Sequence, residues 1–270
     1  MRASPDMAPG IPSSVRAVQW RGVGALTERE VWRMLRLWRQ TIAPHVMSAV
    51  LFIVVFGVAL GSRITSIDGI DYEVFIIPGL TLMGVTGAAF ANTASSLFQA
   101  RSDGFIEDPA SSPMTPMQLT IGYLSGGLAR GLLIGVGTLL AVRIFVDFPL
   151  AHPAYLAVVL VASSLGFAAL GAVVGLCSKS FEAQAFVGNL VIQPLVFLGG
   201  VFYSIASLTE PWRSISHADP IFYAVAAARH GMLGSAEVDP LLALGVTVAL
   251  SAALVGWAAA LFARGTGIRT

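Results

Sequence analysis

Charged residues are scarce in this chain of 270 residues: Asp, Glu, Lys and Arg together make up 11% of the sequence, whereas 56% is hydrophobic. Soluble domains carry about 25% charged residues, and so few charges would leave wide apolar patches on a soluble protein of this size. The mean hydropathy of +0.78 agrees. The composition excludes an ordinary soluble enzyme and a disordered protein, and it predicts an integral membrane protein.

Cysteine and lysine are almost absent. The single cysteine, Cys177, excludes a disulfide framework and a cysteine-based metal site. The single lysine, Lys179, follows Ser178, whereas a phosphate-binding P-loop needs lysine directly after glycine. If ATP drives this protein, another subunit must hold the ATP and its Mg²⁺, and this chain itself is expected to hold no cofactor or metal. The net charge of +1 does not favour a nucleic-acid partner.

Six apolar segments are long enough to cross a bilayer, which takes about 20 residues. They cover approximately residues 42–62, 74–98, 118–142, 154–178, 183–204 and 240–263. No segment alternates in the manner of outer-membrane strands. The sequence therefore predicts an all-α membrane protein with six transmembrane helices. Residues 27–270 are expected to form a single transmembrane domain after a flexible cytoplasmic N-terminus at 1–26.

Basic residues are unevenly divided between the two sides that six spans create. Four lie on the side away from the termini, namely Arg63, Arg143, Arg213 and Arg229. Eleven lie on the side of the termini: Arg2, Arg16, Arg21, Arg29, Arg33, Arg36, Arg39, Arg101, Lys179, Arg264 and Arg269. Because cytoplasmic loops carry the excess of basic residues, both termini are predicted to be cytoplasmic.

The segment before the first span has amphipathic character. Thr27 and Glu30 have the spacing of a capping box. Apolar residues then recur at helical spacing beside a stripe of arginines: Val31, Leu35, Trp38 and Ile42 beside Arg29, Arg33 and Arg36. This pattern predicts a helix lying in the inner headgroup layer. The alternative is that residues 28–40 are simply the cytoplasmic end of the first transmembrane helix.

The segment between the second and third spans, residues 99–116, concentrates charge and contains three prolines that prevent one continuous helix. A short helical piece near residues 103–108 could present Phe105 and Ile106 to a soluble partner subunit. The alternative is a solvated loop.

The third span contains an arginine and a row of glycines. Arg130 lies near its middle, where an arginine costs about 2.5–3.5 kcal/mol on insertion scales. It could face backbone carbonyls, a water-filled cavity or an anionic headgroup, and a translocation path is the favoured interpretation. A shifted span with a snorkelling Arg130 is the alternative. Gly127, Gly131 and Gly135 share one helix face, which predicts close packing within the protomer or at a dimer seam.

The long segment between the last two spans contains several breaks. Pro194 lies inside the fifth span, and Pro211 and Pro220 interrupt the chain after that span. Residues 221–233 are apolar but too short to span. Such a segment could re-enter the membrane and cap the outer mouth of a pathway, or it could be an inert surface hairpin.

Three stretches together resemble the membrane subunits of ABC-2-type ABC transporters, in particular bacterial inner-membrane permeases of the YadH and NodJ kind. The first is residues 38–41 (WRQT) with 75–80 (FIIPGL), and the second is residues 101–115. The third is residues 199–204 (GGVFYS), followed by Pro211-Trp212 and residues 219–224 (DPIFYA). The likeness covers about residues 30–270. It departs at residues 106–109, where relatives more often continue with Leu-Glu and apolar residues.

The resemblance implies an exporter permease in the bacterial cytoplasmic membrane that moves a drug-like, lipid or lipid-linked saccharide cargo. Two copies, or one with a related permease, would work with two ATPase subunits among membrane lipids. The coupling helix that meets the ATPase would lie among Arg101, Asp103, Gly104, Phe105, Ile106, Glu107 and Asp108. Pro78 and Gly79 would lie at the outer start of the second span. Short outer re-entrant helices would include Gly199, Gly200, Phe202, Tyr203, Pro211, Trp212, Pro220 and Tyr223.

Two other function classes fit the sequence less well. An intramembrane hydrolase needs a buried Ser–His pair or a metal cluster, but the four histidines, His45, His152, His217 and His230, all lie near span ends or in the outer segment. An ion-coupled secondary carrier typically holds carboxylates at the membrane midplane, and here the carboxylates nearest the spans, Glu73 and Glu182, lie at their edges. The chain is therefore not expected to be an enzyme.

Overall fold

The computed structural model describes residues 13–61, 66–235 and 237–267, and these are almost entirely helical. The long helices are α1 (Ser13–Arg36), α3 (Ala43–Gly61), α4 (Tyr72–Ser102), α6 (Pro116–Val142), α7 (Pro153–Cys177), α11 (Pro220–Leu233) and α12 (Pro240–Ala263). The short ones are α2 (Trp38–Thr41), α5 (Glu107–Ser111), α8 (Phe181–Phe186), the π-helix η1 (Val187–Ile192), α9 (Gln193–Leu198), the 3₁₀-helix η2 (Ile205–Ser207) and α10 (Trp212–Ala218). Strands β1 (Ser66–Ile67) and β2 (Ile70–Asp71) form a small antiparallel hairpin.

Six helical segments of the described chain are long and apolar enough to cross a membrane, which confirms the predicted number of spans. They are α2 with α3, α4, α6, α7, the continuous α8–η1–α9 segment, and α12. The fifth segment ends at Leu198, before the predicted limit at residue 204. Its end coincides with Gly199 and Gly200, and Gly200 adopts a φ of +83°, which side chains rarely tolerate.

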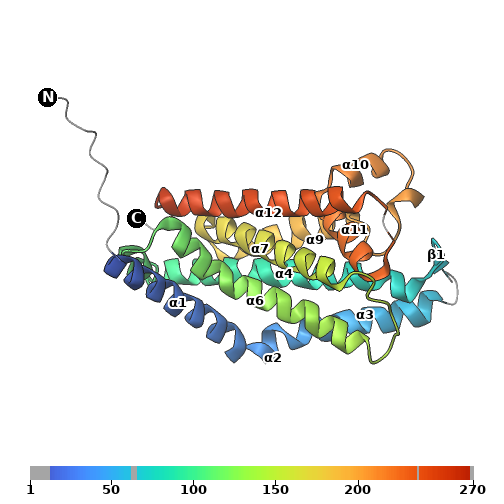
Figure 1. Ribbon diagram of the computed structural model, residues 1–270, viewed down its shortest axis with the longest axis horizontal. Helices are drawn as coiled ribbons and strands as arrows, with labels where there is room; N and C mark the ends of the chain where they lie inside the picture. The colour runs from blue at the N-terminus through green and yellow to red at the C-terminus, as the bar shows by residue number, and fades with distance from the viewer. Residues whose placement is uncertain (1–12, 62–65, 236, 268–270) are drawn as a thin grey trace.

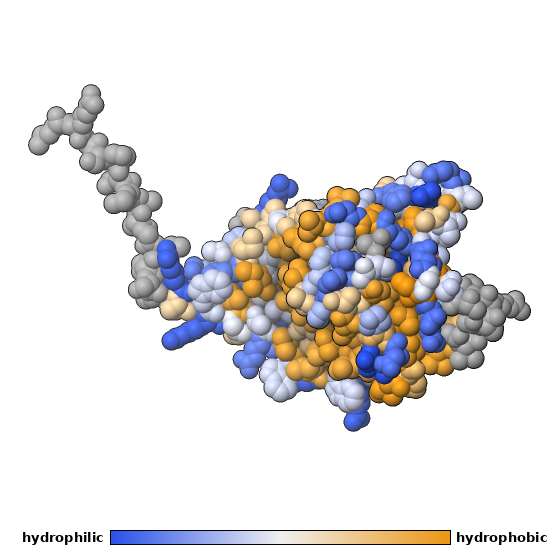
Figure 2. Space-filling view, turned by 45° about the vertical axis from the view of Figure 1, so that its right-hand side comes forward, coloured by the Kyte–Doolittle hydropathy of each residue, from blue (hydrophilic) through white to orange (hydrophobic). Residues whose placement is uncertain are grey.

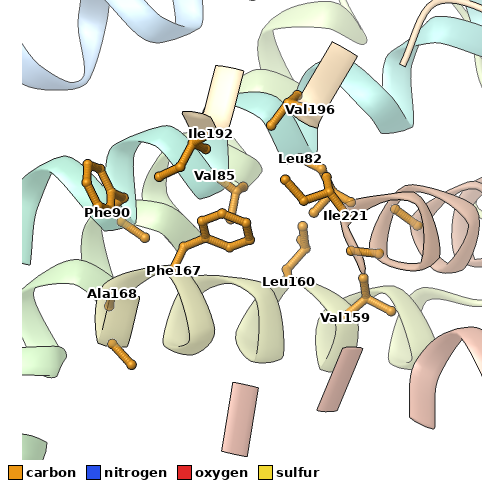
Figure 3. Close-up of a cluster of buried hydrophobic side chains, with 14 of the residues drawn as sticks. Leu82, Val85, Phe90, Val159, Leu160, Phe167, Ala168, Ile192, Val196 and Ile221 are labelled. Carbon is orange, nitrogen blue, oxygen red and sulfur yellow. The ribbon is translucent and has the colours of Figure 1, made fainter. Parts of the chain in front are cut away.

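Helices α4 and α7 form the centre of the bundle (Figure 1). In the most apolar part of α4, 78% of residues are buried inside the protomer, against 11% in the first span and 22% in α12. Figure 3 shows the core that joins them, in which Val85 from α4 and Phe167 from α7 lie near Ile192 from η1. The outer spans therefore expose their apolar faces to lipid or to other chains.

The glycine row of α6 packs inside the protomer. A Cβ atom on Gly127 would lie 2.4 Å from Thr93 Oγ1 and 2.6 Å from Ala168 Cβ. A Cβ atom on Gly131 would lie 2.5 Å from the Ser164 hydroxyl oxygen, and one on Gly135 would lie 2.9 Å from a methyl group of Val85. The row therefore brings α6 close to α4 and α7. Of the two predicted roles, packing within the protomer is the one observed.

Helix α1 differs from the prediction in its limits. It begins at Ser13 and runs through Thr27 and Glu30, so these two residues do not form an N-terminal cap. The same helix covers residues 13–26, where the sequence predicted a flexible segment. Residues 1–12, which include Arg2, lie outside the described part, as do Ser62, Arg63 and Arg269. A capping box occurs instead at the start of α6, between Thr115 and Gln118.

The face of α1 that packs on the bundle is not its apolar stripe. The buried residues of α1 are Gln19, Val23, Leu26, Glu30 and Met34, and they contact mainly α6. The predicted stripe is turned outward, with Leu35 38% and Trp38 50% exposed. An exposed apolar stripe is the face that an interfacial helix turns toward lipid.

The two ends of the bundle differ in character. Helix α1 begins, and α12 ends, at the end where α5 lies, whereas α10 and the β-hairpin lie at the opposite end (Figure 1). Figure 2 shows a wide hydrophobic surface over the middle of the molecule, with hydrophilic residues gathered towards the start of α1 and over α10. The pattern is that of a bundle whose middle lies in lipid and whose ends lie in water.

Candidate functional site

A cavity of about 860 Å³ opens at the end of the bundle where α1 begins. One wall is α1, and the other is the end of α4 with the loop after it. The lining mixes arginines, carboxylates and exposed aromatic rings, namely Arg29, Arg33, Arg36, Glu28, Glu30, Asp103, Asp108, Trp32 and Phe105. A concave surface with charges of both signs and exposed aromatic groups is well suited to bind a protein partner.

A buried carboxylate forms the floor of this cavity. The Glu30 side chain is 0% exposed, and its Oε2 atom accepts hydrogen bonds from Ser96 Oγ at 2.7 Å and from Arg33 Nη2 at 3.2 Å. Its Oε1 atom accepts from Arg29 Nη2 at 3.0 Å. Arg33 also donates to the Asn92 carbonyl oxygen at 3.0 Å. The cluster ties α1 to α4 by charged hydrogen bonds, which are stronger than neutral ones.

The loop after α4 contains the residues predicted for coupling. Gly104 adopts a φ of +76° and turns the chain, and the side chain of Phe105 after it is 61% exposed. Ile106 is 3% exposed and packs into the core, so the expectation that it faces a partner is wrong. Helix α5 begins at Glu107 rather than near Asp103. Glu107 and Asp108 lie in its first turn, where carboxylates are favoured by the helix dipole.

Arg101, in the last turn of α4, bonds to the bundle rather than facing the cavity. Its Nε atom donates to the Gly267 carbonyl oxygen at 2.9 Å, and its Nη1 atom donates to the carbonyl oxygens of Gly175 and Ser178, each at 3.0 Å. These carbonyls belong to the ends of α7 and α12 and the chain just beyond them. Arg101 thus joins three chain segments at this end of the bundle and is only partly exposed.

Arg130 lies in the middle of α6 and is 8% exposed. Its Nη2 atom donates to the Thr41 carbonyl oxygen at 3.1 Å, at the junction of α2 and α3. The predicted possibility of a backbone carbonyl partner is therefore the one observed. Arg130 lines neither the cavity beside α1 nor the concavity between α4 and the α8–η1–α9 segment.

A second concavity, of about 360 Å³, lies between α4 and the α8–η1–α9 segment. Its lining includes the polar residues His45, Thr86, Ser95, Gln184, Asn189 and Gln193. The apolar part is formed by residues such as Phe90, Ile192 and Val196, which Figure 3 shows at the edge of the core. We call this feature the membrane crevice.

The opposite end of the bundle is held together by a buried arginine. Arg229 of α11 is 2% exposed and donates to Glu237 Oε1 at 2.9 Å and to the Gly200 carbonyl oxygen at 2.8 Å. Its guanidinium lies 4.0 Å from the centre of the Phe75 ring, a cation–π contact. The arrangement fixes α11 against α4 and the turn after α9.

The predicted outer residues lie at the same end of the bundle as this arginine (Figure 1). Gly79 of α4 leaves room for the chain at Val201, whose Cα atom would lie 2.7 Å from a Cβ atom at position 79. Tyr72 donates to the Phe202 carbonyl oxygen, and Tyr203 to that of Leu198, each at 3.3 Å. The predicted segment at 221–233 is helix α11, which Pro220 begins, and Trp212 begins α10. Pro211, Trp212 and Tyr223 lie on the outer surface or at its edge.

One carboxyl group at the start of α11 is buried. Asp219 is 3% exposed and its Oδ1 atom accepts a hydrogen bond from the Ile221 N–H at 2.9 Å, which caps the helix. Its Oδ2 atom has no hydrogen-bond partner among the described residues. Burial raises the pKa of Asp219 to about 6, and the bond from Ile221 offsets part of that effect.

Sequence reasoning missed Glu30 and Arg229 as the centres of these two clusters. Glu30 was placed in a capping box, and only its spacing of four residues from both Leu26 and Met34 could have indicated a buried position. Arg229 was counted only as a basic residue of the outer side. Its position in an otherwise apolar segment, eight residues before Glu237, is the signal that it needs a buried partner.

The bundle and its polar ends define a multi-pass membrane protein, and comparison with known proteins places the chain more narrowly. The model of the ABC-2 type transporter family matches residues 21–233. The inner membrane transport permease YadH of Escherichia coli K12 is 36% identical over 253 residues, which is 93% of this chain and 98% of that protein. Nodulation protein J of Rhizobium leguminosarum bv. viciae is 24% identical and that of Rhizobium meliloti is 22% identical, over 83% and 85% of this chain and 88% and 90% of those proteins.

The chain therefore belongs to the ABC-2 type transporter family, and it is the membrane subunit of an ABC transporter. Membership implies association with an ABC ATPase, because the membrane subunit carries no P-loop of its own. The six spans and the name of the E. coli relative agree on a multi-pass protein of the inner membrane.

Proposed function

We propose that this chain is the permease of an ATP-driven exporter, and that its cognate ATPase docks on the cavity formed by α1 and the loop at 103–111. The observation that carries the proposal is this cavity, lined by arginines, carboxylates and the exposed rings of Trp32 and Phe105. Charged residues are scarce elsewhere in the chain, so a mixed-charge concavity is the best candidate surface for a soluble partner.

The proposed working unit contains two ATPase subunits, which supply the ATP and Mg²⁺ sites, and two copies of this permease. The cavity and both described ends of the chain then face the cytoplasm, in agreement with the excess of arginines on that side. The cargo is a drug-like, lipid or lipid-linked saccharide molecule moved outward. ATP binding must favour one arrangement of the permeases over another, and a differential contact at the docking cavity can transmit that bias.

Helix α1 gives the cavity a direct connection to the bundle. Arg29 and Arg33 line the cavity and at the same time hold Glu30, which bonds to α4. The ring of Tyr123, on α6, lies 5.5 Å from the Arg29 guanidinium and stacks on Phe262 of α12. A partner that moves the arginines therefore acts on three membrane-spanning helices through neighbouring contacts.

The test is a charge reversal in the loop at 103–111, beside the docking cavity. Glu107→Lys should leave membrane insertion intact but lower ATP hydrolysis that depends on the reconstituted permease–ATPase complex. Asp147→Lys is the matched control, since Asp147 is 94% exposed and lies beyond the far end of α6, where its ion pair with Arg143 is worth little. Equal hydrolysis by both variants and the unaltered protein would refute docking at this surface.

A further inference from the structure

Helix α3 shows at what depth of the membrane Arg130 lies. The helix has 19 residues, which at about 1.5 Å per residue span about 28 Å, close to the thickness of the hydrocarbon core. Thr41 lies two residues before the start of α3, so it marks one boundary of the hydrocarbon. Arg130 donates to the Thr41 carbonyl oxygen at 3.1 Å. Its guanidinium is therefore just inside this boundary, near the lipid head groups.

Helix α4 gives the same depth for Arg33. The helix begins at Tyr72, at the opposite end of the bundle, and Asn92 lies 20 residues further along it, which is a distance of about 30 Å. Arg33 donates to the Asn92 carbonyl oxygen at 3.0 Å. Arg33 and Arg130 thus lie at nearly the same level, and they are close enough for the charge of Arg33 to act on Arg130.

Positive charges outnumber negative ones at this level. Among the described residues, the carboxylate that pairs with arginines here is Glu30, which Arg29 and Arg33 share. Arg130 is 8% exposed and forms no ion pair with a described residue. A buried charge without a counter-charge is costly. An anion supplied from outside the chain would remove this cost.

The two arginines also have donor groups that the described chain does not use. The Nε atoms of Arg33 and Arg130 are both buried without a hydrogen-bond partner among the described residues. Arg130 reaches Thr41 because the chain breaks there: the His45 N–H bonds to the Ile42 carbonyl oxygen at 3.1 Å, which leaves the Thr41 carbonyl oxygen to Arg130. A guanidinium holds its donors in a planar fork that matches the oxygens of a phosphate group.

The surface beside these arginines suits a lipid. We call residues 37–42, which join α1 to α3 and lie beside α6, the elbow (Figure 1). Leu37 and Trp38 are exposed on it, and the guanidinium of Arg39 lies 5.6 Å from the centre of the Trp38 ring. Tryptophan and arginine are favoured where hydrocarbon meets head groups, and basic pockets between spanning helices bind anionic lipid head groups.

We propose that the elbow binds one anionic phospholipid, with its phosphate between Arg33 and Arg130, Arg39 beside it at the surface, and its acyl chains along Leu37 and Trp38. The phosphate supplies the negative charge that the described residues lack at this level. Arg33 also lines the docking cavity, so the lipid lies next to that cavity. Its binding, however, requires neither the ATPase nor a cargo, and the inference does not rest on the proposed function.

The test uses the full chain in phosphatidylcholine nanodiscs that contain a minor fraction of phosphatidylglycerol with identical acyl chains. Native mass spectrometry of the released protein counts the lipids that stay bound. We expect one phosphatidylglycerol per chain to be retained in preference to phosphatidylcholine, and equal retention of the two lipids would overturn the proposal. An excess of inorganic phosphate should leave the lipid bound. Displacement would mean that the site recognises a free anion and would overturn its assignment to a lipid.

Variants that each remove one positive charge locate the lipid at the elbow. Arg33→Gln and Arg130→Gln should each lower phosphatidylglycerol retention about tenfold. Arg21→Gln is the matched control, because it removes the same charge from an exposed position on α1, and it should leave retention unchanged. An equal loss in all three variants would mean that net charge alone attracts the lipid. That result, or full retention in both elbow variants, would overturn the site.

Two further variants separate lipid binding from folding. Arg130→Lys keeps the charge but not the planar fork, so it should retain more phosphatidylglycerol than Arg130→Gln; equal loss in these two proteins, at equal thermal stability, would contradict a charge-based contact. Arg39 is exposed, so Arg39→Gln leaves the core intact even where the buried arginines are needed for folding. It should lower retention about threefold, as expected for an exposed ion pair. Equal retention by Arg39→Gln and Arg21→Gln would refute binding at the elbow.

Discussion

Each end of this bundle contains a buried ion pair, but the buried partner has the opposite charge at the two ends. At the end with α5 the buried partner is a carboxylate, Glu30, and its arginines Arg29 and Arg33 are 43% and 27% exposed. At the other end the buried partner is an arginine, Arg229, and its carboxylate Glu237 is 14% exposed. Arg229 is also held by the Gly200 carbonyl oxygen and the Phe75 ring.

The difference lies in what a ligand can reach. The arginines that hold Glu30 line a large cavity, so a partner protein can compete for them. A movement of α1 that broke these charged contacts could be compensated by an external group, which is what a switch requires. The contacts of Arg229 include a backbone carbonyl and an aromatic ring, and its side chain is 2% exposed. This cluster is a fixed brace, and the comparison predicts different responses to mutation.

The largest effect is expected for Arg229→Met. The substitution keeps an apolar chain of similar length but leaves the carboxylate of Glu237 and the Gly200 carbonyl oxygen without their donor. Breaking one partner of a buried pair costs about 3–5 kcal/mol, and thermal unfolding in detergent should show a correspondingly less stable protein. Glu237→Gln is the control, since the amide can still accept a hydrogen bond from Arg229 and should lose less. Equal stability of Arg229→Met and the unaltered protein would contradict the brace.

A smaller effect on stability, but a larger one on function, is expected for Glu30→Gln. The amide keeps the shape of a site in which Gly126 leaves little room, and it can still bond to Ser96. The exposed guanidiniums of Arg29 and Arg33 can turn to water, so the cost should be about 1–3 kcal/mol. ATP hydrolysis by the permease–ATPase complex should fall more than the amount of folded complex. If hydrolysis per folded complex is unchanged, the cluster is a static brace like that of Arg229.

Arg130 is a buried arginine of a third kind, because no carboxylate among the described residues forms an ion pair with it. Arg130→Met leaves the Thr41 carbonyl oxygen unpaired but also removes a charge that is costly in the membrane. These contributions oppose each other, so stability should change by about 1 kcal/mol or less. Transport should fall more than expression, because the junction of α2 and α3 loses its tie to α6. Arg130→Lys, which keeps a donor, should restore part of transport; if expression alone falls, Arg130 has only a structural role.

The sequence was sufficient to predict features that depend on a single segment of the chain. Spans of about 20 apolar residues, the glycine row from Gly127 to Gly135, and the breaks at Gly199 and Pro220 were all predictable, because each follows from one segment and its solvent. Ile106 was assigned wrongly because burial in a short loop depends on the helices that cover it, which local sequence does not encode.

The membrane crevice and the two charged clusters were beyond prediction for the same reason. Glu30 is 66 residues away in sequence from Ser96, and Gln184 faces residues of α4 some hundred positions earlier. Such contacts depend on how the helices pack, and a single sequence gives the helices but not their neighbours. The apolar stripe at Leu35 and Trp38 shows the limit clearly: the periodicity predicted a helix but not which face of it meets the bundle.

The smallest expected effect concerns Asp219, the buried carboxyl group at the brace end. The folded protein raises its pKa to about 6 from an ordinary value near 3.8, because burial disfavours the ionised form. A raised acid pKa stabilises the fold fully below about pH 4, and this contribution is lost as the pH rises through about 6. Hydrogen exchange in α10 and α11, corrected for intrinsic rates, should therefore quicken by up to about tenfold between pH 5 and 7. Asp219→Asn retains an acceptor for the Ile221 N–H and cannot ionise, so its exchange should lose this pH dependence. An identical profile in both proteins would show that another group titrates, whereas the exchange of α1 at the opposite end should not follow Asp219 in either.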